Sequence, residues 1–118
     1  MTNQDVALDH VFHALADPTR RAVLQRLSRG PASVKELAEP FSMALPSFLQ
    51  HLQVLEESGM IRSKKSGRVR TCEIEAAPLS QAELWIAAQR EIWEARLDRL
   101  EIYLNELQIK EKHDGKEV

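Results

Sequence analysis

Proline and glycine divide the first forty residues of the chain into short segments, and this punctuation limits the folds open to it. Asp17-Pro18 predicts a helix start, because Asp caps a helix well and proline at the first position loses an N–H that has no partner. Gly30-Pro31 predicts the end of that helix, and Pro40 the end of the next one. A compact set of short helices is therefore expected here.

Apolar side chains repeat at helical spacing between these marks. Ser33 opens an S-x-x-E capping box, so a short helix is expected to begin there. The following helix tolerates Pro46 only because it lies in the first turn. Its expected buried stripe has residues spaced four and three apart, namely Phe48, Leu52 and Leu55. The predicted helices cover about residues 3–16, from 18 to the Gly30 stop, from 33 to near 40, and 45–58.

After Gly59 the pattern changes from helical spacing to strand-like alternation. Residues 60–65 and 68–74 are predicted to form two strands joined by a turn at Ser66-Gly67. The chain thus places a small hairpin directly after its fourth helix.

A second capping-box pattern, from Ser80 to Glu83, opens a long helix predicted to reach about Lys110. This helix has more apolar surface than a small hairpin can cover, which favours pairing with a second copy. The alternative is that Trp85 and Trp93 cover the core of a single chain. The expected fold is mainly α with a small β-hairpin wing, in the order α-α-α-α-β-β-α. This is a winged helix-turn-helix, and residues 1–118 are predicted to be a single domain.

Composition excludes several classes of protein. With 118 residues, 43% of them hydrophobic and 29% charged, the chain has the size and composition of one soluble globular domain. It has no apolar run of eighteen residues and no secretory signal at its start, so no membrane partner is expected. The single cysteine, Cys72, rules out an internal disulfide and favours a reducing, cytoplasmic location.

The distribution of charge indicates nucleic acid more clearly than the net charge does. The chain carries a formal net charge of −2, yet residues 60–72 contain five cations and no acid. These cations are Arg62, Lys64, Lys65, Arg68 and Arg70. A local basic stripe of this kind is an electrostatic footprint for DNA, and its alternative is a solvated loop. A helix presented by another helix fits the major groove, and a basic hairpin beside it can reach the backbone.

Five short stretches of the chain resemble the signature of ArsR-type winged-helix repressors. They are DPTRR with Leu24, Leu37-Ala38, PSFLQHL with Leu55, ESGMI, and KSGR, and the resemblance as a whole covers about residues 6–103. The resemblance implies a homodimer that is joined by its first and last helices, residues 1–16 and 80–110. It also implies binding to an inverted-repeat operator in double-stranded DNA, usually with repression. The expected interface residues are Leu8, Phe12, Trp93, Leu97, Leu100 and Leu104.

Candidate DNA contacts lie on the helix over 45–58 and on the hairpin. Gln50 is the expected base reader, because its amide can pair bidentately with adenine. Leu49 either contacts a thymine methyl or packs on the neighbouring helix, and His51 is expected to pack with its polar tip outward. Arg20 and Arg21 either touch phosphate or only lie on the surface. The full predicted set is Pro46, Ser47, Leu49, Gln50, His51, Gln53, Lys64, Lys65, Arg68 and Arg70.

Proteins of the kind that this chain resembles have two known types of metal site. The sequence has neither of them, so no metal and no cofactor are expected. The arsenic-type site needs Cys-x-Cys in the short helix, where this chain has VKELAEPFS. The zinc-type site needs histidines in the last helix, which has none before His113. His10 and His13 could share a helix face but are more readily explained as surface histidines, and Cys72 as a small buried hydrophobe. No small-molecule effector can be identified.

Two other functions compete with DNA binding. Ser47 and His51 lie one turn apart, as a nucleophile and base would, but no catalytic elbow or oxyanion loop accompanies them, so no enzyme is expected. A protein-interaction module of the same fold is the second alternative. The basic wing argues against it, because pure dimerisation needs no cations there.

Overall fold

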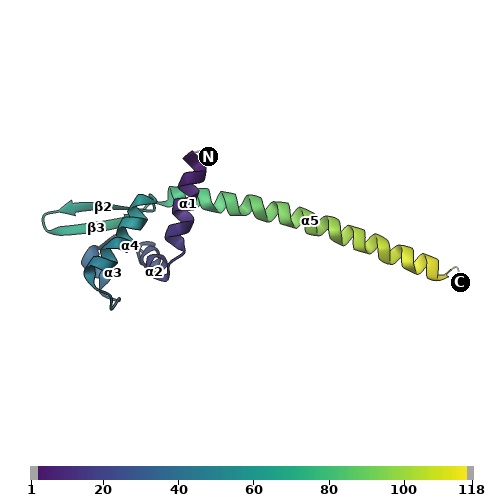
Figure 1. The fold of residues 1–118 in the computed structure, drawn as a ribbon, viewed down its shortest axis with the longest axis horizontal. Helices are drawn as coiled ribbons and strands as arrows, with labels where there is room; N and C mark the ends of the chain where they lie inside the picture. Colours follow the sequence, from purple (N-terminus) through teal and green to yellow (C-terminus); the bar gives the residue numbers. More distant parts are fainter. Residues whose placement is uncertain (1–2, 117–118) are drawn as a thin grey trace. The chain divides into compact units, whose positions relative to one another are not determined.

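The computed structural model describes the backbone of residues 3–116, and the helical and hairpin elements occur in the predicted order with one additional strand (Figure 1). The elements are α1 (Asn3–Leu15), α2 (Pro18–Leu27), β1 (Ala32–Ser33), α3 (Val34–Ala38), α4 (Leu45–Glu57), β2 (Ile61–Ser66), β3 (Val69–Ile74) and α5 (Ala76–Lys116). Across this described range, no helix combines the length and apolar character that a bilayer span requires.

The predicted starts of α2 and α3 are confirmed. Asp17 is the N-cap of α2, and its Oδ2 accepts a hydrogen bond of 3.1 Å from the Arg20 backbone N–H. Ser33 caps α3 through a complete capping box with Glu36. The hairpin turn lies one residue later than predicted, because Ser66 still pairs with Val69 across β2 and β3.

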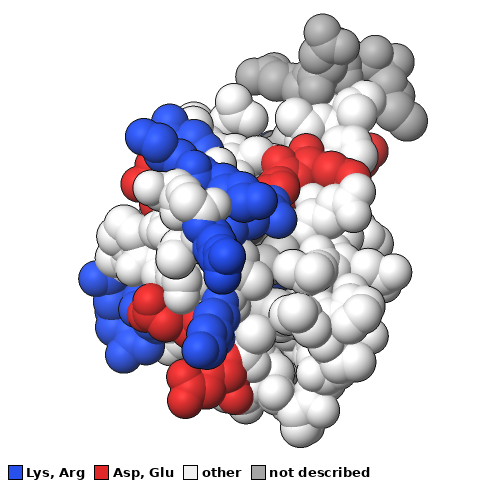
Figure 2. Space-filling model, turned by 90° about the vertical axis from the view of Figure 1, so that its left-hand side faces the viewer, with Lys and Arg blue, Asp and Glu red and all other residues white. Residues whose placement is uncertain are grey.

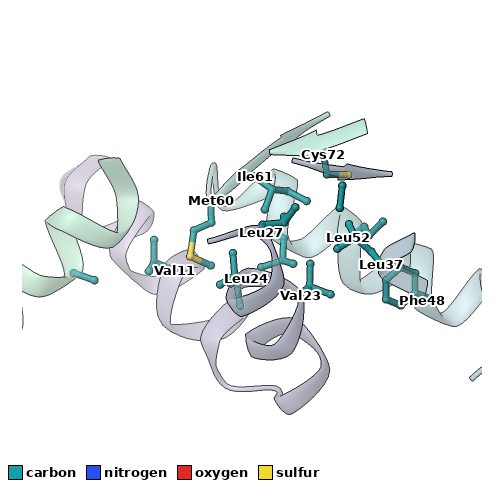
Figure 3. Close-up of a cluster of buried hydrophobic side chains, with 14 residues drawn as sticks. Val11, Val23, Leu24, Leu27, Leu37, Phe48, Leu52, Met60, Ile61 and Cys72 are labelled. Atoms are coloured by element: carbon teal, nitrogen blue, oxygen red, sulfur yellow. The ribbon is translucent and has the colours of Figure 1, made fainter. Parts of the chain in front are cut away.

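The α4 stripe forms the centre of the hydrophobic core, as predicted. Phe48, Leu52 and Leu55 are all buried, and they pack with residues of α1, α2 and α3 and with the base of the hairpin (Figure 3). The labelled neighbours are Val11, Val23, Leu24, Leu27, Leu37, Met60, Ile61 and Cys72. Burying one face of α4 leaves its opposite face as the surface that can meet a ligand.

Strand β1 was not predicted. It pairs antiparallel with β3, with Ala32 opposite Cys72 and Ser33 opposite Thr71, which gives the sheet order β1-β3-β2. Two residues are too short to show alternation, so only the tertiary pairing reveals the strand. The pairing ties the start of α3 to the hairpin.

Helix α5 is longer than predicted at both ends. It begins at Ala76 rather than Ser80 and continues to Lys116 rather than about Lys110. Pro78 does not delay its start, because a proline in the first turn loses an N–H that has no partner. Contacts divide the chain into two compact units, residues 1–83 and 84–118.

Replacing Leu52 with alanine tests the buried face of α4. Leu52→Ala is expected to lower the free energy of unfolding by about 2–5 kcal/mol, because it removes buried methyl groups and leaves a cavity. The matched variant Leu45→Ala, on the exposed side of the same helix, is expected to change it by less than about 0.5 kcal/mol. Urea denaturation followed by circular dichroism measures both. Equal losses in the two variants would contradict this orientation of α4.

Candidate nucleic-acid interface

The face of α4 opposite the core is exposed, as the helical spacing predicted. Pro46, Ser47, Gln50 and Gln53 all lie on the surface. The Gln53 amide donates to Glu57 Oε1 at 3.0 Å, whereas the side-chain amide of Gln50 forms no hydrogen bond with any residue in the described part of the chain. Gln50 therefore presents a complete amide to the outside.

His51 lies at the side of α4 that faces α2. Its ring is half-buried, and its Nδ1 is 3.1 Å from the Arg20 guanidinium and 3.7 Å from Asp17 Oδ2. This position differs from that of Gln50, because His51 joins α4 to the start of α2. A DNA contact by His51 stays a prediction.

The two arginines at the start of α2 bind carbonyl groups at the end of α1. Arg20 donates through Nε to the Ala14 carbonyl at 2.8 Å, and Arg21 donates to the Leu15 carbonyl at 2.8 Å. The last carbonyls of a helix have no partners within it, so these bonds complete the C-terminus of α1. Both side chains are therefore bound to backbone carbonyls of the same chain. Contact with phosphate was the other role predicted for them.

The contacts at the start of α2 also lower the pKa of Asp17. Burial pulls this pKa upward, but the Arg20 backbone N–H and the charges of His51 and Arg20 outweigh that effect and hold it below the ordinary value. The ionised carboxylate is therefore the form that stabilises the folded protein.

The cations of the hairpin fall into two groups. Arg62 is paired with Glu73, across the strands, and with Glu75 at 3.2 Å, and these carboxylates raise its pKa. Lys64, Lys65 and Arg68 are exposed and form no ion pair with the residues that the structure describes. These three cations keep their charge available for an anionic ligand.

Arg70 connects the hairpin to α4. Its guanidinium pairs with Glu56 of α4 and donates through Nε to Ser63 Oγ at 2.9 Å. Ser63 in turn donates to Glu56 Oε1 at 2.5 Å. The network holds the base of the wing against α4. Sequence reasoning missed Glu56, because nothing in a helical pattern signals a partner fourteen residues away.

A groove lies between α4, the hairpin and α3. Its apolar lining includes Leu45 and Leu49 of α4, with Val69 of the hairpin. Its cationic lining consists of Lys35, Lys65, Arg68 and Arg70. Seen from the hairpin end, Lys and Arg side chains gather in a band, with acidic groups at its sides (Figure 2). Leu49, which is 37% exposed, lines this groove, and Lys35 is a cation that the sequence patterns did not single out.

The residues predicted at a dimer interface lie in both compact units. Leu8 and Phe12 are half-buried in α1 and pack against the core. Trp93, Leu97, Leu100 and Leu104 lie on the exposed part of α5, where 49–60% of each residue is accessible. The α5 residues thus offer the larger free apolar surface.

The candidate sensing residues occupy ordinary positions. Cys72 is fully buried, and burial raises the pKa of its thiol, which makes it a poor nucleophile. His10 and His13 are exposed on α1. No cluster of three or more His, Cys, Asp or Glu residues placed to hold a metal occurs in the described part of the chain. The absence of a metal or cofactor stays a prediction.

Comparisons with known proteins all point to transcriptional regulators with a helix-turn-helix domain. A family model described as a helix-turn-helix domain matches residues 15–64. The chain is 36% identical over 72 residues to the HTH-type transcriptional regulator Rv2034 of Mycobacterium tuberculosis, covering 61% of this chain and 67% of that one. It is 29% identical over 79 residues to the transcriptional repressor SdpR of Bacillus subtilis, covering 67% and 88%. A crystal structure of an ArsR family transcriptional regulator is 61% identical with a TM-score of 0.75, covering 80% of this chain and 97% of that one.

The pH dependence of stability tests the Asp17 cap. Asp17→Ala is expected to cost about 0.5–2 kcal/mol at pH 7, where the carboxylate accepts its hydrogen bond. Because the folded-state pKa is lowered, this stabilisation is present above the unfolded pKa of about 3.9 and disappears as the pH falls through the folded value. Urea denaturation at several pH values measures the difference from wild type.

Asp17→Asn is the matched variant, because its amide oxygen keeps the cap acceptor and loses the charge. It is expected to retain most of the stability at pH 7. A wild-type advantage over Asp17→Ala that stays constant down to pH 2 would show that the charge plays no part.

Proposed function

Since the chain belongs to the ArsR family of transcriptional regulators, we propose that it is a homodimeric repressor that binds an inverted-repeat operator. The observation that carries this proposal is the shared groove between the exposed face of α4 and the cationic hairpin. A reading surface and a backbone-binding surface lie side by side there. Such a protein acts in the cytoplasm on double-stranded DNA, and no effector is identified.

We assign base reading to the exposed face of α4. Gln50 presents an unengaged amide there, and a glutamine amide matches the donor and acceptor of adenine in the major groove. Ser47 lies in the first turn, where the N-cap Ala44 supplies no side-chain hydrogen bond, so that the Ser47 hydroxyl and the helix N-terminus suit a phosphate. Pro46 and Gln53 border the same face, and Leu49 meets the DNA from the wall of the groove.

We assign backbone binding to the hairpin and α3. A recognition helix in the major groove and a wing over the neighbouring backbone leave one sugar-phosphate strand between them. The groove between α4 and the hairpin offers that strand Lys35, Lys65 and Arg68. Lys64 stands one residue along β2 and therefore points to the other face of the hairpin. Arg70 contributes a positive wall while it remains bound to Glu56.

Two copies of the chain are needed for a site of useful length. One recognition helix contacts only a few base pairs, and two-fold symmetry repeats it in half-sites about 10 base pairs apart. We assign contact with the second copy to the exposed apolar residues of α5 and, separately, to Leu8 and Phe12 of α1. Repression is proposed because the similar protein SdpR is named a transcriptional repressor.

Loss of base reading is expected from Gln50→Ala. Selection from random DNA should enrich an imperfect palindrome with the wild type and lose preference at one base pair in each half-site with the variant. The discrimination lost is about 1–3 kcal/mol for each half-site. Gln81→Ala, an exposed glutamine on α5, is the control and should select the wild-type sequence. The absence of any enriched palindrome with wild-type protein would refute the proposal.

Charge removal on the hairpin is expected to weaken binding to every DNA sequence equally. The double variant Lys65→Gln with Arg68→Gln removes four cations from a dimer, so the slope of log affinity against log salt should flatten by up to about 4. Arg62→Gln is the matched control, since this guanidinium is already paired with two carboxylates. Fluorescence anisotropy over a salt series measures the slopes. Equal effects from the double variant and the control would count against the assignment.

A further inference from the structure

Leu49 is an apolar residue on the surface of α4, next to the residue that we assign to base reading. It is exposed and lies outside the buried core cluster, whereas the neighbouring Phe48 is fully buried. Helical geometry places Leu49 roughly 100° around the helix from Gln50. It lies on the flank of α4 that lines the groove shared with the hairpin. Core packing therefore does not explain why this position is apolar.

Two further apolar residues line the same groove. Leu45 lies one turn before Leu49 on α4, and Val69 belongs to the hairpin, and more than half of each is exposed. Lys65 and Arg68 also line the groove and carry its positive charge. The groove thus combines an apolar wall with cations. A ligand that suits both must carry an apolar group close to an anionic one, and a DNA strand does so.

The serine hydroxyls that line the groove are already engaged. Ser33 Oγ donates to Glu36 Oε1 at 3.0 Å and accepts from the Glu36 backbone N–H at 3.1 Å. Ser63 Oγ donates to Glu56 Oε1 at 2.5 Å and accepts from Arg70 Nε at 2.9 Å. Both hydroxyls stabilise the fold, so neither is free to pair with the edge of a base. The wall that α4 contributes to the groove therefore offers an apolar contact.

Thymine is the base whose exposed edge matches an apolar wall. Its 5-methyl group projects into the major groove, and it is the one methyl group that the bases of unmodified DNA present there. The C5 position of a pyrimidine lies at the margin of the groove, close to the backbone of its own strand. Cytosine presents an amino donor in place of the thymine carbonyl and has no methyl group. A side chain between the base-reading face and the backbone-binding cations is thus well placed for thymine.

We propose that Leu49 selects one thymine in each half-site of the operator through contact with its 5-methyl group. The inference rests on the proposed function and adds to it one base and the residue that selects this base. The thymine belongs to the strand whose phosphates bind Lys65 and Arg68. Leu45 extends the same apolar wall. Gln50 reads a different base, so substitutions separate the two preferences.

Removal of one methyl group from the operator tests this contact. Uracil pairs as thymine does and lacks only the 5-methyl group, so it replaces each thymine of the selected palindrome in turn, in both half-sites. Burial of one methyl group is worth about fourfold in an equilibrium constant, and the dimer makes the contact twice. At the contacted position, wild-type affinity should therefore fall on the order of tenfold. Fluorescence anisotropy at constant salt measures it, and a thymine outside the half-sites is the control.

Variants at position 49 show whether Leu49 is the partner of the methyl group. In Leu49→Ala the same uracil substitution should change affinity by less than about twofold, because the contact is already lost. Leu49→Met is the matched control, since it keeps an apolar side chain of similar size, and it should retain most of the uracil penalty. Gln50→Ala should also retain that penalty while losing its own base preference. Circular dichroism checks that each variant folds as the wild type does.

A second base analogue separates the methyl contact from hydrogen bonding at the same position. Cytosine in place of the selected thymine, with guanine opposite, should weaken wild-type binding. Replacing that cytosine with 5-methylcytosine should recover about fourfold for each half-site, because it restores only the methyl group. Leu49→Ala should bind the two cytosine forms equally. Equal binding of both forms by the wild type would show that the methyl group is not recognised and would overturn the inference.

The outcomes distinguish this inference from the function on which it rests. The absence of an enriched palindrome with the wild type refutes both. A palindrome in which no thymine is sensitive to methyl removal refutes the inference and leaves the repressor standing. A uracil penalty of equal size in wild type and Leu49→Ala assigns the effect to another residue or to DNA shape, and it also refutes the inference. A penalty that requires an apolar side chain at position 49 supports it.

Discussion

Burial of one face of α4 is the constraint on which the rest of the structure depends. Phe48, Leu52 and Leu55 lie at the centre of the core, and the helices before α4 and the base of the hairpin after it pack around them. Because a helix side chain one turn away points the same way, burying these three residues fixes the rotation of α4 about its axis. That rotation turns Gln50 outward. Core packing and the proposed DNA reading are therefore two consequences of the same arrangement.

The hairpin depends on α4 in a different way. Its base is held by the cross-linked group of Glu56, Ser63 and Arg70, so the wing is attached to the recognition helix by polar contacts as well as by packing. Its outer cations are not used in this attachment. Ion pairs within the protein would give these exposed cations little role in stability, because exposed ion pairs contribute little to the free energy of folding. The distribution of partners separates the cations that position the wing from those that can bind phosphate.

Local signals predicted most of the fold. Asp17, Ser33 and Pro46 act within one helical turn, so their effect can be read from neighbouring residues, and the structure confirms the helices that they begin. The start of α5 was placed four residues late, because the Ser80 capping pattern suggested a helix start at a point where the helix is already under way. Strand β1 was missed, since its partner β3 lies some forty residues away. The contacts of His51 and Glu56 were missed for the same reason: both partners come from other elements.

The sequence by itself determined the order of the helices and the hairpin, the buried face of α4, the basic character of the wing and the large apolar surface of α5. These are properties of spacing and residue type along one segment, and elementary geometry converts them into faces. Only the tertiary structure decided which cations are already engaged, since Arg62 and Arg70 look like Lys64 and Arg68 until their carboxylate partners are placed beside them. It also decided that Leu49 lines a groove shared with the hairpin and α3. Those features depend on distances between segments that are remote in the chain, and such distances are set only when the core closes.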